Sequence, residues 1–187
     1  MTLAYRIFKQ IQGTWKITRK IPGTGFLNGY AIFDSNPNDP NELFYSENGI
    51  FVFDDGNQLE ASKKYIYRFI EDDIYVFFHE KSAASSASSD SSSSFEESTT
   101  TAQDLIANSL FHRLNISNHL FMQDQRFFKF KALHLCIDDR YNVLYEFNLD
   151  KPDEFKIVYD VHGPKKNYLS ETMFQKKIVD NIGNKLF

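Results

Sequence analysis

Two residues that could carry chemistry lie close together late in the chain, His134 and Cys136, within the segment FFKFKALHLCID. Alternate residues of a β-strand face opposite sides, so these two side chains share one face, while Lys129 and Lys131 occupy the other. Because lysines prefer solvent, we expect His134 and Cys136 to point inward. A nearby imidazole could lower the pKa of the thiol and make it a nucleophile, although a buried, unreactive cysteine beside a hydrogen-bonded histidine is the commoner arrangement.

A second group of chemical side chains comes from two strands near the N-terminus. The motif Gly-x-Trp begins the first expected strand, and alternation sends Trp15 and Arg19 inward along it. An inward arginine needs a partner, because an unpaired buried charge is costly. On the third expected strand Tyr45 and Glu47 share a face, which makes Glu47 the candidate carboxylate for Arg19.

The same alternation completes an inner surface that differs from a hydrocarbon core. It places His112 inward and Phe111 outward. Several phenols also face inward, namely Tyr67, Tyr145 and Tyr159. Such a lining suits a ligand with an aromatic or apolar body and a few polar or anionic groups. The alternative is that these groups satisfy one another in a barrel without a ligand.

Ten short strands must position these side chains. Turn residues, Asn28-Gly29 among them, and alternating runs predict strands at 13–21, 29–35, 42–53, 59–71, 73–80, 109–117, 126–138, 141–149, 154–162 and 167–177. The apolar spacing in MTLAYRIFKQIQ predicts a short N-terminal helix at one end. Because closure removes unpaired edges, we expect an all-β fold, an antiparallel up-and-down barrel forming a single domain over residues 1–187.

Composition limits the classes of function. The 187 residues are 42% hydrophobic and 16% aromatic, enough for one core, and the net charge is −4 with no basic block. A nucleic-acid partner is therefore not expected, nor is a membrane partner, since no segment reaches membrane-spanning length. With a single cysteine and no secretory signal, we expect a cytoplasmic protein, with the nucleus as an alternative location.

A serine-rich segment interrupts the pattern of strands. Ten serines fall between residues 82 and 98, and the segment 82–104 has too little apolar surface to offset the entropy of ordering. We expect a disordered loop that joins two strands. Two alternatives stay open for it, an idle loop or a phosphorylated segment that recruits a protein partner.

An ordered set of short motifs resembles an uncharacterised lipocalin-like, calycin-type domain family of bacteria and fungi. The motifs are GxW, YxExG from Tyr45 to Gly49, HxCxxDxY from His134 to Tyr141, and GPxKxY from Gly163 to Tyr168. The likeness spans residues 8–177 apart from the serine-rich segment. It implies a lipocalin-like barrel and brings no biochemical function with it.

No cofactor is predicted from this sequence. His112, His134 and Cys136 could hold a metal, or one histidine could ligate haem as in the nitrobindin-like barrels that this fold resembles. Two histidines on separate strands do not form a metal-binding motif, however, so metal or haem stays an alternative. Lys166 lies in a Gly-Pro-Lys-Lys turn at the rim, which resembles a phosphate-holding turn but lacks its repeated glycines; a turn with solvated lysines is the other reading.

The preferred functional hypothesis is the binding of a small hydrophobic or aromatic metabolite inside the barrel. Trp15 and the inward tyrosines would enclose its body, and Arg19, His112 and His134 would fix a polar or anionic end. Protein–ligand binding of this kind needs no catalytic residue.

Two other functions compete with ligand binding. The same pocket could perform acid–base chemistry, with His134 as base and either Glu47 or Asp139 as its partner. Tyr67 or Tyr145 would then donate a hydrogen bond to a developing oxyanion. The remaining alternative is an interaction scaffold that acts through the serine-rich segment.

Overall fold

The computed structural model describes residues 1–79, 110–116 and 126–177, and the account below concerns these residues. The serine-rich segment 82–104, for which we expect a disordered loop, lies outside them. Whether residues 1–187 form a single domain therefore stays a prediction.

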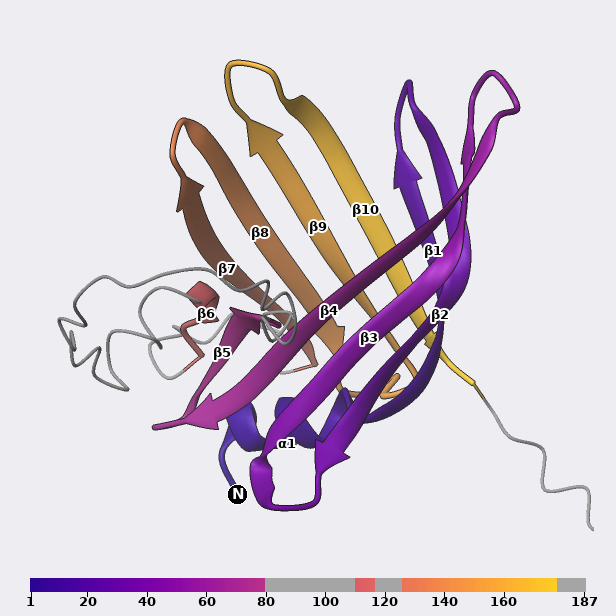
Figure 1. Ribbon diagram of the computed structural model, residues 1–187. Helices are drawn as coiled ribbons and strands as arrows, with labels where there is room; N and C mark the ends of the chain where they lie inside the picture. Colours follow the sequence, from indigo (N-terminus) through magenta and orange to yellow (C-terminus); the bar gives the residue numbers. More distant parts are fainter. Residues whose placement is uncertain (80–109, 117–125, 178–187) are drawn as a thin grey trace, which may run out of the picture.

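Ten antiparallel strands form one sheet that curls into a nearly closed barrel (Figure 1). The strands are β1 (Gly13–Ile21), β2 (Gly25–Asn36), β3 (Asp39–Phe53), β4 (Gln58–Ile70), β5 (Asp73–Phe78), β6 (Leu110–Leu114), β7 (Phe127–Cys136), β8 (Asp139–Asn148), β9 (Glu154–His162) and β10 (Asn167–Lys176). Their order is β6-β5-β4-β3-β2-β1-β10-β9-β8-β7. The predicted all-β barrel is confirmed.

The barrel has a seam between β6 and β7, the two ends of this order. The two strands lie in contact, but the described residues form no hydrogen-bonded ladder between them. The Phe111 ring on β6 instead packs edge-on against the imidazole of His134 on β7, with ring centroids 4.7 Å apart. Side-chain packing thus holds β6 against β7 at the seam, whereas backbone hydrogen bonds hold the other neighbouring strands together.

The turn predicted at Asn28-Gly29 is wrong, because both residues lie within β2. Gly29 pairs directly with Gly49 on β3. A Cβ atom built at Gly29 would lie 2.2 Å from the Asn48 carbonyl oxygen, so the close approach of two backbones, rather than a turn, requires glycine here.

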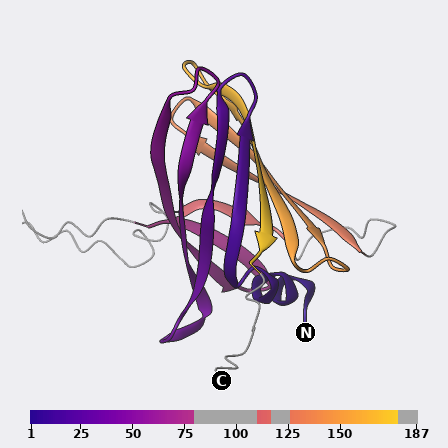
Figure 2. The same ribbon diagram turned by 90° about the vertical axis from the view of Figure 1, so that its right-hand side faces the viewer.

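Helix α1 (Leu3–Gln10) lies at one end of the barrel (Figure 2). The Thr2 hydroxyl caps it by accepting a hydrogen bond of 3.3 Å from the Tyr5 N–H. Its buried face, Ala4, Ile7 and Phe8, packs into the barrel end. Among the described residues, no helix has both the length and the apolar character to cross a membrane.

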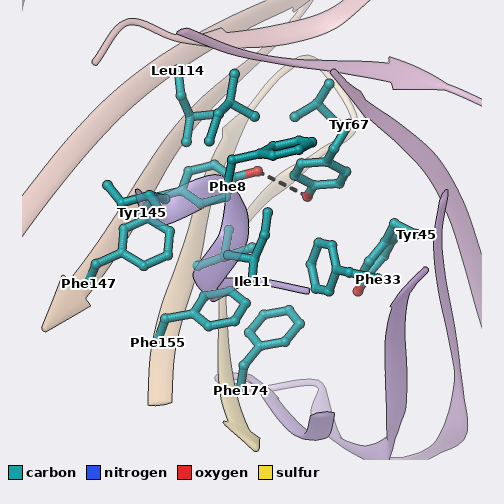
Figure 3. Close-up of a cluster of buried hydrophobic side chains, with 14 of the residues drawn as sticks. Phe8, Ile11, Phe33, Tyr45, Tyr67, Leu114, Tyr145, Phe147, Phe155 and Phe174 are labelled. Carbon is teal, nitrogen blue, oxygen red and sulfur yellow. Dashed lines mark hydrogen bonds between the residues drawn. The ribbon is translucent and has the colours of Figure 1, made fainter. Parts of the chain in front are cut away.

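Above α1 the interior is a tightly packed aromatic cluster (Figure 3). Phe155 and Phe174 stack with ring centroids 4.3 Å apart, and Trp15 meets Phe155 edge-on at 4.7 Å. The Trp15 indole N–H donates a 2.7 Å hydrogen bond to the Ile11 carbonyl oxygen. This end of the barrel is therefore filled by the protein itself.

Candidate functional site

The packed core gives way to a cavity at one level along the barrel axis. On β1, Trp15 and Ile17 are fully buried, whereas Arg19 on the same face lines the cavity. On β9, Phe155 is buried in the same way, and Tyr159, four residues farther along the strand, lines the cavity. Arg19 and Tyr159 therefore belong to the floor of a chamber that extends away from α1.

The chamber has a volume of about 580 Å³ and lies at the barrel end opposite α1. Its walls are mostly aromatic and aliphatic: Ile21, Leu27, Phe51, Phe53, Leu59, Ala61, Tyr65, Phe78, Phe111, Tyr141, Tyr159 and Tyr168. The other lining residues are polar or contain sulfur: Arg19, Thr24, Lys63, His134, Cys136 and Ser170. A volume between about 300 and 1,000 Å³ with mostly apolar walls is typical of a small-molecule site.

Phe111 reaches the chamber although strand alternation predicts it to face outward. The pairing of β5 with β6 shifts between Val76 and Phe77, which pair with His112 and Leu110. Phe111 is thus an extra residue of a β-bulge, and a bulge re-aims its side chain. This prediction is wrong for a local reason that alternation alone does not reveal.

Arg19 and Glu47 form a bidentate ion pair beneath the chamber. The distances are 2.6 Å from Nη1 to Oε1 and 2.7 Å from Nη2 to Oε2, and Arg19 Nε donates a 2.8 Å hydrogen bond to the Thr172 hydroxyl. The Tyr45 hydroxyl donates a short hydrogen bond to Glu47 Oε2. All three guanidinium nitrogens therefore have a protein partner.

Burial and the contact between Arg19 and Glu47 act in opposite directions on the pKa values of this pair. Burial alone would raise the pKa of Glu47, but the Arg19 guanidinium outweighs it and holds that pKa below its usual range. Burial alone would likewise lower the pKa of Arg19, and Glu47 outweighs it, so the pKa of Arg19 is raised. The pair is charged on both sides and neutral in sum.

Lys63 is a cavity residue that the sequence interpretation missed. It pairs directly with Glu47 in the ladder between β4 and β3, and it lines the chamber. Solvent reaches the side chain, and its Nζ lies 5.9 Å from the centroid of the Tyr159 ring. In the described part of the chain, Lys63 makes no hydrogen bond or ion pair.

The surroundings of Lys63 lower the pKa of its ammonium group. The pKa of Lys63 is lowered to about 8: burial has the largest effect, the positive charge of Arg19 acts in the same direction, and Glu47 opposes both. The side chain as a whole is solvent-exposed, whereas its Nζ lies near the Tyr159 ring among the residues that line the chamber. The signal that could have identified Lys63 is its parity with Tyr65 and Tyr67, which share its strand face.

A deeper polar chain joins His112, Tyr145 and Tyr67. His112 Nε2 lies 2.9 Å from the Tyr145 hydroxyl, which lies 3.3 Å from the Tyr67 hydroxyl (Figure 3 shows the two tyrosines). Among the residues that the structure describes, the buried His112 Nδ1 has no hydrogen-bond partner. Burial, with a small effect of His134, lowers the pKa of His112 to about 3, so this imidazole is neutral.

His134 and Cys136 both line the chamber near its mouth. His134 is half-buried and Cys136 is exposed, so the arrangement of a buried cysteine does not occur here. Burial lowers the pKa of His134, opposed by a hydrogen bond with the Phe111 backbone across the seam. Within the described residues, no hydrogen bond joins His134 to Glu47, which instead binds Arg19 and Tyr45.

Two hairpins are joined at the rim by Lys166. Its ammonium donates hydrogen bonds to the Asp139 carboxylate at 2.6 Å and to the Tyr141 hydroxyl at 3.0 Å. These contacts raise the pKa of Lys166. A Cβ atom at Gly163 would lie 1.9 Å from Asp139 Oδ1, so glycine leaves room for this contact. The Gly-Pro-Lys-Lys turn, where solvated lysines are expected, thus uses Lys166 to bind a carboxylate of the protein.

The structure sorts the candidate residues by depth. Four line the chamber: Arg19, His134, Cys136 and Tyr159. Six are buried elsewhere in the interior: Trp15, Tyr45, Glu47, Tyr67, His112 and Tyr145. Lys166 is exposed at the rim. Within the described residues, no three potential metal ligands of the His, Cys, Asp or Glu type gather in one place.

Solved structures share this architecture at low sequence identity. An S-type phycobiliprotein lyase from Guillardia theta is 8% identical, with 92% of each chain covered and a TM-score of 0.51. The protein Rv2717c from M. tuberculosis is 10% identical, with 95% of this chain and 99% of that chain covered and a TM-score of 0.48. The likeness to the lyase supports the fold alone.

Sequence comparison places the chain in a family without an assigned activity. No curated protein matches the chain. A family model described as a family of unknown function, DUF6314, matches residues 11–176, which contain all ten strands and leave out helix α1. The chain therefore belongs to the family of unknown function DUF6314.

Proposed function

We propose that the barrel binds a small apolar or aromatic molecule with an anionic group in the chamber above Arg19. The observation that carries the proposal is the Lys63 ammonium, which faces an apolar chamber without an ion-pair partner among the described residues. The aromatic walls would cover the body of the ligand, and Lys63 would pair with its charge.

Charge balance around the floor favours an anion over a neutral or cationic ligand. Glu47 already neutralises Arg19, so the net charge near the floor is that of Lys63. A charge in a poorly hydrated site is costly unless it is paired. An anionic group of a ligand would supply the missing partner, whereas a cation would meet two positive side chains.

Two fluorescent dyes with the same ring system test the proposal. 1-Anilinonaphthalene-8-sulfonate carries an anion, and N-phenyl-1-naphthylamine is its neutral counterpart. We expect the native protein to bind both dyes with enhanced fluorescence and the anion more tightly. Lys63→Met should weaken binding of the anionic dye about tenfold, about 1.4 kcal/mol, and leave the neutral dye nearly unchanged.

A pair of neighbouring substitutions locates the binding site. Ala61 lines the chamber, whereas Ser62 lies on the other face of β4. Ala61→Phe should fill the chamber and abolish binding of both dyes, and Ser62→Phe should not. Equal effects of the two substitutions would place the dyes on the outer surface and reject the proposal.

The natural ligand is best sought by native mass spectrometry of the protein purified from its own cells. Denaturation would then release the bound molecule for identification. A stoichiometric apolar anion would support the proposal. A bound cation or sugar would contradict it.

A further inference from the structure

Lys63 combines three features that an amine nucleophile requires. It lies in the chamber rather than on the outer surface, solvent and small molecules can reach it, and no described carboxylate holds it in an ion pair. The neighbouring Lys64 has the opposite parity and is exposed on the outer face of the same strand. The two lysines therefore carry the same functional group in different surroundings.

We propose that Lys63 forms a reversible imine with the carbonyl group of an apolar aldehyde or ketone that enters the chamber. This inference rests on the proposed function, because the carbonyl compound must first be bound by the apolar walls. It names a ligand class for which Lys63 makes a covalent bond rather than an ion pair.

The position of Arg19 supports this role. A lysine is activated as a nucleophile when it is desolvated in an apolar pocket or lies near another cationic group, and Lys63 lines a mostly apolar chamber together with Arg19. Burial and Arg19 lower its pKa to about 8, against about 10.5 for an ordinary lysine. At pH 7.5 the reactive neutral fraction is then on the order of a hundredfold larger than for a lysine with the ordinary pKa.

The reaction balances without an oxidant or a cofactor. The neutral amine attacks the carbonyl carbon, the carbonyl π electrons move to oxygen, and a proton shift gives a neutral carbinolamine. Protonation of its hydroxyl lets water leave, and a C=N⁺ bond forms. The protonated imine carries the same single positive charge as the original ammonium, so the electrostatics beside the Arg19–Glu47 pair are preserved.

Reductive trapping of the full-length chain tests the proposal. The probe is 2-naphthaldehyde at pH 7.5, and added sodium borohydride reduces the imine to a stable secondary amine. Intact mass measures the number of adducts, and peptide mapping locates them. We expect one dominant adduct at Lys63, which lines the chamber, and only minor labelling of Lys64 on the outer face.

Matched variants separate a specific adduct from general lysine labelling. Lys63→Arg keeps the charge and should remove the dominant adduct, while Lys64→Arg should retain it. Labelling spread evenly over the surface lysines, or an unchanged adduct count in Lys63→Arg, would overturn the proposal. If Lys63→Arg does not fold, the peptide map of the native chain decides the question by itself.

Binding of N-phenyl-1-naphthylamine by the same preparation separates this inference from the proposed function. If the dye binds and Lys63 is not labelled, the imine proposal fails while ligand binding stands. If the dye does not bind and Lys63 is not labelled, both fail. Loss of the Lys63 adduct when the neutral dye is added in excess would confirm that both use the same chamber.

Discussion

The two ends of the barrel use the same alternation of inward and outward residues but reach different results. At the helix end, α1 contributes Ile7 and Phe8 to the buried cluster that also contains the stacked rings of Phe155 and Phe174, and the interior is filled. At the open end, inward aromatics such as Phe53 leave a chamber of about 580 Å³. An aromatic lining therefore does not decide between core and pocket; what matters is whether another element fills the space.

A polar layer separates the two ends. The Arg19–Glu47 pair lies where the packed core stops, and Thr172 and Tyr45 complete its hydrogen bonds. Such a buried pair is weak evidence for stability, because desolvation offsets much of the attraction. Its position at the chamber floor instead marks the boundary between the packed core and the chamber, and the pair leaves Lys63 as the net charge of the floor.

The largest contrast should come from truncating one aromatic ring at each end. Phe174→Ala removes a fully buried stacked ring and should lower the free energy of unfolding by about 4 kcal/mol. Phe53→Ala removes a half-buried cavity wall and should cost about 1 kcal/mol, because no new closed void forms. Urea denaturation measures both; equal losses would mean that the two ends are packed alike.

Breaking the polar layer should have the next largest effect. Glu47→Leu leaves the Arg19 guanidinium buried without its carboxylate and should cost about 3 kcal/mol. The double variant Arg19→Met with Glu47→Leu removes both charges and should recover most of that loss. A double variant as unstable as Glu47→Leu would show that the hydrogen bonds to Thr172 and Tyr45 matter more than the charge.

His112 should make the protein less stable in mild acid. Its folded pKa of about 3 lies below the ordinary 6.5, so the unfolded chain binds more protons between these values. Stability should therefore fall as the pH drops through this window, by on the order of 2 kcal/mol between pH 7 and pH 5. Thermal melts of His112→Phe should show a smaller loss over this range; an identical pH profile would assign the acid sensitivity to other groups.

The smallest effect should be a gain in stability from Lys63→Met. The folded pKa of Lys63, about 8, lies below the ordinary 10.5, so the native protein pays for the charged form at neutral pH. We expect a gain of about 1 kcal/mol at pH 7, discounted because solvent reaches the amine.

This gain should depend on pH in a defined direction. The wild-type protein becomes more stable as the pH rises from about 8 to 10.5, so the advantage of Lys63→Met shrinks over that range. Lys64→Met on the outer face is the matched control and should change little. A gain that does not vary with pH would point to apolar contacts of the new methionine.

Local pattern predicts much of the fold. The strands predicted at 13–21 and 154–162 coincide with β1 and β9, and inward parity anticipates the contact between Arg19 and Glu47. Parity is a property of consecutive residues, so each strand carries it by itself. The turn predicted at Asn28-Gly29 is wrong because glycine is required there by the pairing with Gly49, a residue on another strand.

Lys63 shows where the candidate site escaped sequence reasoning. Lysines normally face solvent. Because Lys129 and Lys131 lie on the opposite face of their strand, this rule correctly predicts that His134 faces the interior. The same rule hides Lys63, whose inward direction is visible only from its parity with Tyr65. In one sequence, a lysine that faces the barrel interior cannot be told from the many that face solvent.

The sequence by itself determined the class of fold, the number of strands and, outside the bulge at Phe111, most of the inward faces, because alternation acts between neighbouring residues. The tertiary structure decided depth: which inward side chains α1 helps to bury, which line the chamber, and which already have partners. Depth depends on the register between strands and on the curl of the whole sheet. Only those long-range relations show that Arg19 is paired with Glu47 and that Lys63 faces the chamber without an ion-pair partner among the described residues.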